Sequence, residues 1–225
     1  MKSGEWPLIH LAQVDSTQAF LKRHPELGFC AVLADSQTAG RGRQGNRWES
    51  APGAGLWMSA ALPLQDQPPG LVLQLAMRHA LAALPPDPRL GLKWPNDLVA
   101  RTEIGLVKLG GIIGELSGGR LILGLGINLT GAPDLPDRAV PAACLQALGL
   151  PAPQPRELAR TLLDRWTRLE KAPEPTFRWP EEGEALRWET GQGVCLGWEA
   201  DGRLRVATNA GLERLTAAEV RGLRN

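Results

Sequence analysis

The chain has 225 residues, enough for one domain of ordinary size and a small appendage. Hydrophobic residues make up 43% of it, and 25 basic residues nearly balance 24 acidic ones. This balance argues against a general nucleic-acid binder, which carries a basic excess. No apolar run reaches the roughly 18 residues that span a bilayer, and the N-terminus has no signal-peptide core. We expect a soluble, cytoplasmic protein without DNA or membrane partners.

Cysteines and histidines are few and scattered. Cys30, Cys144 and Cys195 have no metal-ligand spacing and are predicted to be buried free thiols. His79 lies near the apolar stripe of a predicted helix and is expected to pack there. The sequence therefore predicts neither a protein metal site nor a Ser-His-Asp triad.

Strands and helices are mixed in the first half of the chain. Apolar and β-branched segments predict strands at residues 8–14, 29–37 and 55–64. A helix is predicted over 15–24, with Asp15 or Ser16 as its N-cap. A second helix is predicted over 71–84, because its apolar spacing stops at two prolines.

The middle of the chain predicts extended structure. Residues 89–100 are extended and broken at Pro95, and Gly118-Gly119 predicts a hairpin between 108–116 and 119–129. In the second strand of that hairpin the odd-numbered residues from 121 to 129 are apolar and form a core face. The opposite face carries Gly124, Gly126 and Asn128, so a ligand or another segment is expected to approach the backbone there.

Helices are predicted at 141–148 and 155–171, followed by a proline-rich boundary at 173–180. The tail alternates with period two around turns at Asp201-Gly202 and Ala210-Gly211, which indicates a small barrel-like β-module. We predict an α+β fold on a mostly antiparallel sheet. The predicted domains are residues 1–183 and 184–225.

The segment AGRGRQGNRW, residues 39–48, joins glycines to arginines. Glycine-rich backbone can form an anion-binding concavity, and arginine adds a planar charged fork. Gly40, Gly42 and Gly45 match G-x-G-x-x-G by letter, but no helix pattern follows, and the chain has no Walker A motif. By itself the segment is equally well explained as a solvated surface loop. As a binding element it would be mobile when empty and ordered by an anion.

A second polar group is KWPNDL, residues 93–98, which is followed by Lys108 and later by Asn128. Lys93 could be an ordinary surface lysine. Asn96 and Asp97 read alone favour a turn. The motifs become informative only when they are taken together.

The motifs STQ at 16–18, SQTAGRGRQGNRW at 36–48, KWPNDL, KLGGIIGEL and GLGINL occur in this order. In this combination the sequence resembles the biotin protein ligases, over residues 14–129 motif by motif. The resemblance implies a catalytic domain related to lipoate ligases and class II tRNA synthetases, followed by a small SH3-like β-barrel. Many bacterial members carry an N-terminal DNA-binding domain. Because the first motif is reached by Ser16, we expect the short form without it.

The resemblance implies an ATP-dependent enzyme that joins the carboxylate of biotin to the α-phosphate of ATP, giving biotinyl-5′-AMP. The acyl group then passes to one lysine of a biotin carboxyl carrier protein, an acetyl-CoA carboxylase subunit. ATP, Mg²⁺ bound through ATP, and biotin are the expected cofactors and substrate. Positive side chains must bring the two anions together. The catalytic residues implied are Arg43, Lys93, Asp97 and Lys108.

Binding residues follow from the same matches. Those implied for biotin are Ser16, Thr17, Gln18, Gln37, Arg41, Gly42, Arg43 and Lys108. Those implied for ATP and the adenylate are Arg41, Arg43, Trp48, Asn96, Lys108, Gly126 and Asn128. Gln18 departs from the asparagine common in the family. Glu115 is left out, because it and Lys108 have opposite parity and share a strand face only if the strand is bulged.

Two alternative functions stay open. A lipoate–protein ligase on the same scaffold would not need the polar contacts of Ser16, Thr17 and Gln37. A non-catalytic biotinyl-AMP sensor would act through protein or nucleic-acid contacts. Family members often form homodimers through a sheet edge, but no residue establishes the oligomeric state here.

Overall fold

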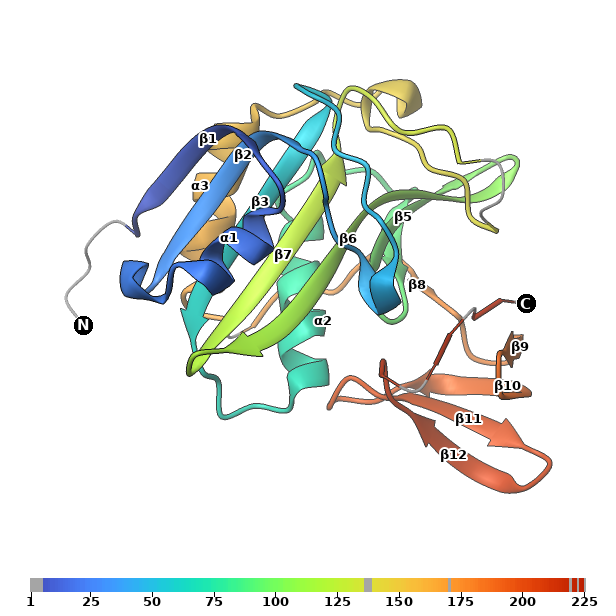
Figure 1. Ribbon diagram of the computed structural model, residues 1–225. Helices are drawn as coiled ribbons and strands as arrows, with labels where there is room; N and C mark the ends of the chain where they lie inside the picture. Colours follow the sequence, from blue (N-terminus) through green and yellow to red (C-terminus); the bar gives the residue numbers. More distant parts are fainter. Residues whose placement is uncertain (1–5, 136–138, 170, 219, 222, 225) are drawn as a thin grey trace.

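The computed structural model describes residues 6–135, 139–169, 171–218, 220–221 and 223–224. Within these residues the strands form an eight-stranded and a four-stranded sheet, and three α-helices pack on the larger sheet (Figure 1). The predicted α+β class and the mostly antiparallel sheet are confirmed.

The larger sheet has the order β1-β2-β3-β7-β6-β5-β4-β8. Neighbouring strands are antiparallel except for β1 with β2 and β4 with β8, which are parallel. Its strands are β1 (Leu8–Val14), β2 (Cys30–Gln37), β3 (Gly55–Pro63), β4 (Leu90–Lys93), β5 (Asp97–Thr102), β6 (Gly105–Ser117), β7 (Arg120–Asn128) and β8 (Arg178–Trp179).

Helices cover both faces of this sheet. The helices α2 (Pro69–Leu81) and α3 (Pro155–Trp166) lie on one face, over the main hydrophobic core. The short helix α1 (Thr17–Arg23) lies on the other face (Figure 1). There Leu21 belongs to a small hydrophobic cluster with Cys30, Val32, Ala61 and Ile122. The hydroxyl of Ser16 accepts a hydrogen bond from the Ala19 amide, which confirms Ser16 as the N-cap.

The predicted hairpin joins β6 to β7. Gly118 and Gly119 have φ values of 57° and 69°, the left-handed conformation that a two-residue hairpin turn requires. The predicted alternation along β7 is also confirmed: Leu123, Leu125, Ile127 and Leu129 lie in the main core. On the opposite face Ile122 is covered by α1, whereas Gly124, Gly126 and Asn128 are among the residues that line a pocket.

A β-bulge in β6 decides which side chains share a face. Leu98 pairs with Gly110, but its neighbour Val99 pairs with Lys108, so Leu109 is the extra residue. The bulge places Lys108 on the same face as Gly111, whose added Cβ would lie 3.5 Å from the Lys108 Nζ. Glu115 shares that face as well. It still lies outside the pocket, because α1 intervenes and Lys22 pairs with it at 2.7 Å.

The tail forms the second sheet, with the order β12-β11-β10-β9 and antiparallel pairing throughout. Its strands are β9 (Ala185–Trp188), β10 (Gly191–Trp198), β11 (Leu204–Thr208) and β12 (Gly211–Leu215), and both predicted turns are found. Trp94, between β4 and β5, is buried in this sheet's core and donates to the Gly202 carbonyl at 3.1 Å. The domain boundary between residues 183 and 184 stays a prediction.

The predicted helix at 141–148 is wrong. Only the 3₁₀ turn η3 (Gln146–Leu148) forms there. The Lys108 amide donates to the Pro141 carbonyl at 2.7 Å, and the Ala143 amide donates to the Lys108 carbonyl at 2.9 Å. Pairing with β6 therefore overrides local helix propensity. The helix predicted to reach residue 171 ends earlier, at Trp166, and residue 170 lies outside the described residues.

Several simpler predictions are confirmed. Cys30, Cys144 and Cys195 are buried free thiols. His79 is 8% exposed on α2. None of the helices in the described residues is long and apolar enough to cross a membrane.

Candidate active site

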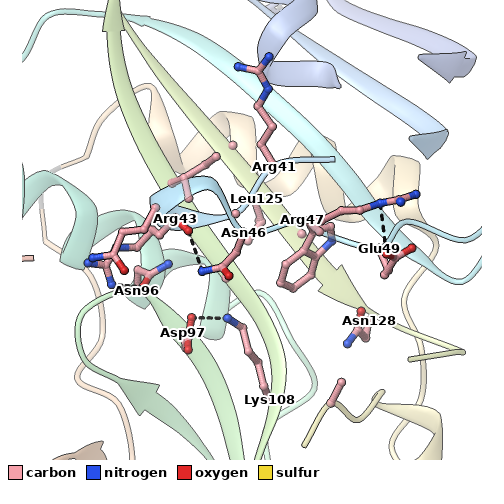
Figure 2. Close-up of a pocket in the computed structure, with 18 of the residues that line it drawn as sticks. Arg41, Arg43, Asn46, Arg47, Glu49, Asn96, Asp97, Lys108, Leu125 and Asn128 are labelled. Atoms are coloured by element: carbon pink, nitrogen blue, oxygen red, sulfur yellow. Dashed lines mark hydrogen bonds and ion pairs between the residues drawn. The ribbon is translucent and has the colours of Figure 1, made fainter. Parts of the chain in front are cut away.

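A pocket of 310 Å³ opens on the face of the larger sheet that α1 partly covers. Its walls come from the start of α1, the Gly/Arg loop (residues 39–48), the β4–β5 turn and strands β3, β6 and β7 (Figure 2). Every predicted site residue lines it: Ser16, Thr17, Gln18, Gln37, Arg41, Gly42, Arg43, Trp48, Lys93, Asn96, Asp97, Lys108, Gly126 and Asn128. The fold thus brings together motifs that are more than 100 positions apart in the sequence.

The pocket is strongly basic although the chain is nearly neutral. Its charged lining residues are the basic Arg41, Arg43, Arg47, Lys93 and Lys108 and the acidic Glu49 and Asp97. Inside a partly enclosed cavity such an excess attracts anions more strongly than it would in bulk water.

Lys108 and Asp97 form the central ion pair of the pocket. The Lys108 Nζ lies 2.6 Å from the Asp97 Oδ1, and the side chains are 28% and 17% exposed (Figure 2). The β6 bulge makes this pair possible, because it turns Lys108 toward the pocket face. The same ammonium lies 5.4 Å from the ring centroid of Trp48. Both contacts restrict where the charge of Lys108 can point.

Lys93 is the most buried cation of the pocket, and Arg43 is half-buried. Lys93 is 8% exposed, and its Nζ lies 4.5 Å from the Trp179 ring centroid, within cation–π range. Burial lowers the pKa of Lys93, and Asp97 partly opposes this change. Burial likewise lowers the pKa of Arg43 from its very high ordinary value. An entering anion would meet two cations that water solvates poorly.

The Gly/Arg loop folds back on itself. The Gly42 amide donates to the Asn46 carbonyl at 2.8 Å, and the Trp48 amide donates to the Gly40 carbonyl at 2.9 Å. Gln44, at the tip, has a left-handed φ of 56°. Arg41 is exposed, and its side chain points away from the Asp97–Lys108 pair (Figure 2). In this conformation the Gly42 amide is occupied within the loop, and Arg43 is the loop arginine that reaches Asn96 (Figure 2).

A neutral hydrogen-bonding wall completes the pocket. The Gln37 Oε1 accepts from the Thr17 amide at 2.8 Å and from the Thr17 hydroxyl at 3.1 Å. The Thr17 hydroxyl also shares a 2.8 Å hydrogen bond with the Ser59 hydroxyl, and the Gln37 Nε2 donates to Ser50 at 2.8 Å. This network presents donors and acceptors without net charge, as recognition of a neutral polar group requires.

Sequence analysis missed several lining residues. Ser59 is fully buried in β3. The sequence feature that could have indicated it is a single hydroxyl side chain within an otherwise apolar strand. Val220 and Leu223 line the pocket from the C-terminal tail. No local pattern indicates them, because only the packing of the second sheet brings the tail to the pocket.

The bare face of β7 is explained by two side chains that pack on it. A Cβ added to Gly126 would lie 2.5 Å from the Trp48 indole, so Trp48 rests directly on the backbone. The Gln18 side chain packs on Gly124 in the same way, because a Cβ added there would lie 2.0 Å from the Gln18 Oε1. Gln18 is 2% exposed, and neither of its polar atoms has a hydrogen-bond partner among the described residues. Gln18 also lines the pocket, so a bound molecule that reached its amide would satisfy it.

Asn128 ends β7 with one half of its amide engaged. Its Nδ2 donates to the Ala143 carbonyl at 3.0 Å. Its Oδ1 is buried and accepts no hydrogen bond from any described residue. A ligand that donates an N–H here would satisfy it.

In the part of the chain that the structure describes, no group of three or more His, Cys, Asp or Glu side chains is arranged to hold a metal ion.

Comparison with known families places this fold and pocket in a class of ligases. Residues 11–131 match the pattern of the Biotin/lipoate A/B protein ligase family. The chain belongs to this family.

The individual relatives have narrower names than the family as a whole. The chain is 33% identical to the biotin–[acetyl-CoA-carboxylase] ligase of Paracoccus denitrificans, over 93% of this chain and 98% of that one. It is 35% identical to the ligase of the same name from Mycobacterium tuberculosis, over 72% of this chain and 63% of that protein. A solved structure of the Aquifex aeolicus biotin protein ligase in complex with biotin and ATP superimposes with a TM-score of 0.74. It has 27% identity and covers 97% of this chain and 99% of its own.

Proposed function

We propose that the protein is an ATP-dependent biotin protein ligase that biotinylates one lysine of a biotin carboxyl carrier protein. The observation that carries the proposal is the pairing, in one pocket, of the basic set around Lys108 and Arg43 with the neutral Thr17–Gln37–Ser59 network. Biotin has the matching features, a carboxylate at one end and a neutral ureido group at the other. The relatives named above carry this activity in their names.

In the first half-reaction a carboxylate oxygen of biotin attacks the α-phosphorus of ATP, and the bond to the departing pyrophosphate breaks. Both reactants are anions, so they repel each other in water. Lys108, aimed by Asp97, and Arg43 are suited to hold the carboxylate and the α-phosphate together. They also stabilise the charge that develops in the transition state.

The adenine side of the pocket is assigned to Trp48 and Asn128. Trp48 offers an aromatic face that rests on Gly126. The free Oδ1 of Asn128 suits an exocyclic amino group, which is a donor. Mg²⁺ is expected to arrive with the phosphates of ATP and to neutralise part of their charge.

In the second half-reaction the acceptor lysine amine attacks the acyl carbon of biotinyl-5′-AMP, forming an amide and releasing AMP and a proton. Asp97 is the pocket carboxylate next to Lys108, and we assign it to orienting that amine. Closure of the Gly/Arg loop would shield the reactive intermediate from water.

The test incubates the protein with biotin, ATP, Mg²⁺ and a biotin carboxyl carrier domain, and follows biotinyl-lysine by mass spectrometry. We expect one modified lysine, with biotinyl-5′-AMP formed when the carrier is omitted. Lipoate in place of biotin is the matched control, and preferential transfer of lipoate would favour a lipoate ligase. Binding of biotinyl-5′-AMP without transfer would favour a sensor. The carrier's identity, the absence of DNA binding, the oligomeric state and the cytoplasmic location stay predictions.

A further inference from the structure

Arg43 is a half-buried cation held by uncharged oxygens. Its Nη1 donates to the Asn96 Oδ1 at 3.2 Å, and its Nη2 donates to the carbonyls of Ala217 and Val220. Among the described residues no carboxylate forms an ion pair with it, in contrast to Lys108, which pairs directly with Asp97.

Asn96 is fixed in the orientation that this contact needs. It is 6% exposed, and its Nδ2 donates to the Ile112 carbonyl at 2.9 Å. Its backbone carbonyl accepts from the Ile112 amide at 2.9 Å, so main chain and side chain are both anchored on β6. Because the amide nitrogen is engaged with a carbonyl, the amide oxygen faces the guanidinium.

A neutral acceptor and a carboxylate would have different consequences at this position. A carboxylate would hold Arg43 equally well but would cancel its charge before any substrate entered. An amide fixes the guanidinium without adding a negative charge. Asp97 opposes the charge of Arg43 only from beyond ion-pair distance, so the half-buried guanidinium still favours an incoming anion. Asn96 and the two backbone carbonyls together form such a charge-neutral cradle, and the C-terminal tail contributes two of its three acceptor oxygens.

We propose that Asn96 is a positioning residue that aims Arg43 into the pocket and preserves its charge for the anionic group of the substrate. This inference rests on the proposed function. It differs from the expectation that Asn96 contacts ATP itself, because it makes every effect of Asn96 depend on Arg43.

The test is a double-mutant cycle on biotin-dependent ATP–pyrophosphate exchange, with Asn96→Asp, Asn96→Ala, Arg43→Ala and both combined variants. Hydrogen bonds to charged groups predict that Asn96→Asp lowers kcat/KM for ATP about 10- to 100-fold. Asn96→Ala, which frees Arg43 without neutralising it, should lower it about 3- to 10-fold. In the Arg43→Ala background both effects should shrink to less than about twofold, since interacting residues are not additive.

The outcomes are distinguishable. If the unmutated protein shows no exchange, the proposed function fails. If it exchanges and Asn96→Asp matches it, the charge-neutral cradle is wrong. An Asn96 effect that persists undiminished without Arg43 would indicate direct contact with ATP or a purely structural role through Ile112, and would overturn the proposal. Thermal unfolding of each variant checks folding, and if Asn96→Asp does not fold, the cycle with Asn96→Ala decides.

Discussion

Replacing Gly126 by alanine tests whether Trp48 must lie on bare backbone. The added Cβ would lie 2.5 Å from the indole, whereas ordinary contact begins at 3.4 Å, an overlap of 3.4 − 2.5 = 0.9 Å. The indole has little room to move, because Trp57 packs edge-on at 6.3 Å and Lys108 lies over the ring. Overpacking of this kind costs about 1–3 kcal/mol. For a chain of this size that lowers Tm by about 2–12 °C.

The functional consequence should fall on the nucleotide. A displaced Trp48 loses packing against adenine worth about 0.5–1.5 kcal/mol, so the KM for ATP should rise about 2- to 10-fold. The KM for biotin should change less, because the Thr17–Gln37–Ser59 network lies on another wall. Pyrophosphate exchange and calorimetry measure both effects.

Gly114→Ala on the neighbouring strand is the matched control. A Cβ at Gly114 would lie 3.4 Å from the nearest atom, the flexible Leu123 side chain, so it fits as it stands. If Gly126→Ala matched Gly114→Ala in both Tm and the KM for ATP, the close packing of Trp48 on β7 would be refuted.

Three further changes probe other parts of the pocket. Arg43→Ala removes a charge-assisted contact worth about 1.5–3 kcal/mol, so bound biotinyl-5′-AMP should dissociate about 10- to 100-fold faster in stopped-flow measurements. Biotin affinity should fall less than this, and unchanged release would contradict the role of Arg43. Ser59→Ala removes one hydrogen bond from the neutral wall. It should raise the KM for biotin about 2- to 10-fold and leave the KM for ATP unchanged. An equal rise in both KM values would argue that this wall does not recognise the ureido group. Burial lowers the pKa of Lys93 below 10.5, so between the lowered value and 10.5 the native chain binds fewer protons than the unfolded chain, and the free energy of unfolding should rise with pH. Lys93→Met should lack this rise in urea titrations at several pH values, and an identical pH profile would show that burial does not lower the pKa of Lys93.

Local patterns along the chain were reliable where one physical cause dominates. The pair Gly118-Gly119 predicted its hairpin, because few residues other than glycine adopt the left-handed turn conformation. The helix capped by Ser16 and the alternation along β7 were predicted for similarly local reasons. Residues 141–148 failed, because partners on β6, distant in sequence, outweighed local propensity.

The sequence motifs identified the site residues, but they did not predict how the side chains are arranged in space. Parity alone put Lys108 and Glu115 on opposite faces of β6, and the bulge at Leu109 reversed this. Glu115 stays outside the pocket because Lys22 of α1 binds it, which is a different reason from the predicted one.

The sequence by itself determined which chemical groups are present: a glycine-rich loop with three arginines, two lysines near a carboxylate, and a strand with two glycines on one face. It determined them because backbone conformation and charge are properties of short segments. The tertiary structure alone decided that Ser59 joins Thr17, that the C-terminal tail reaches Arg43, and that Asn96 is the amide that holds it. These contacts join residues far apart in the chain, and they form only when separate elements pack on a shared core.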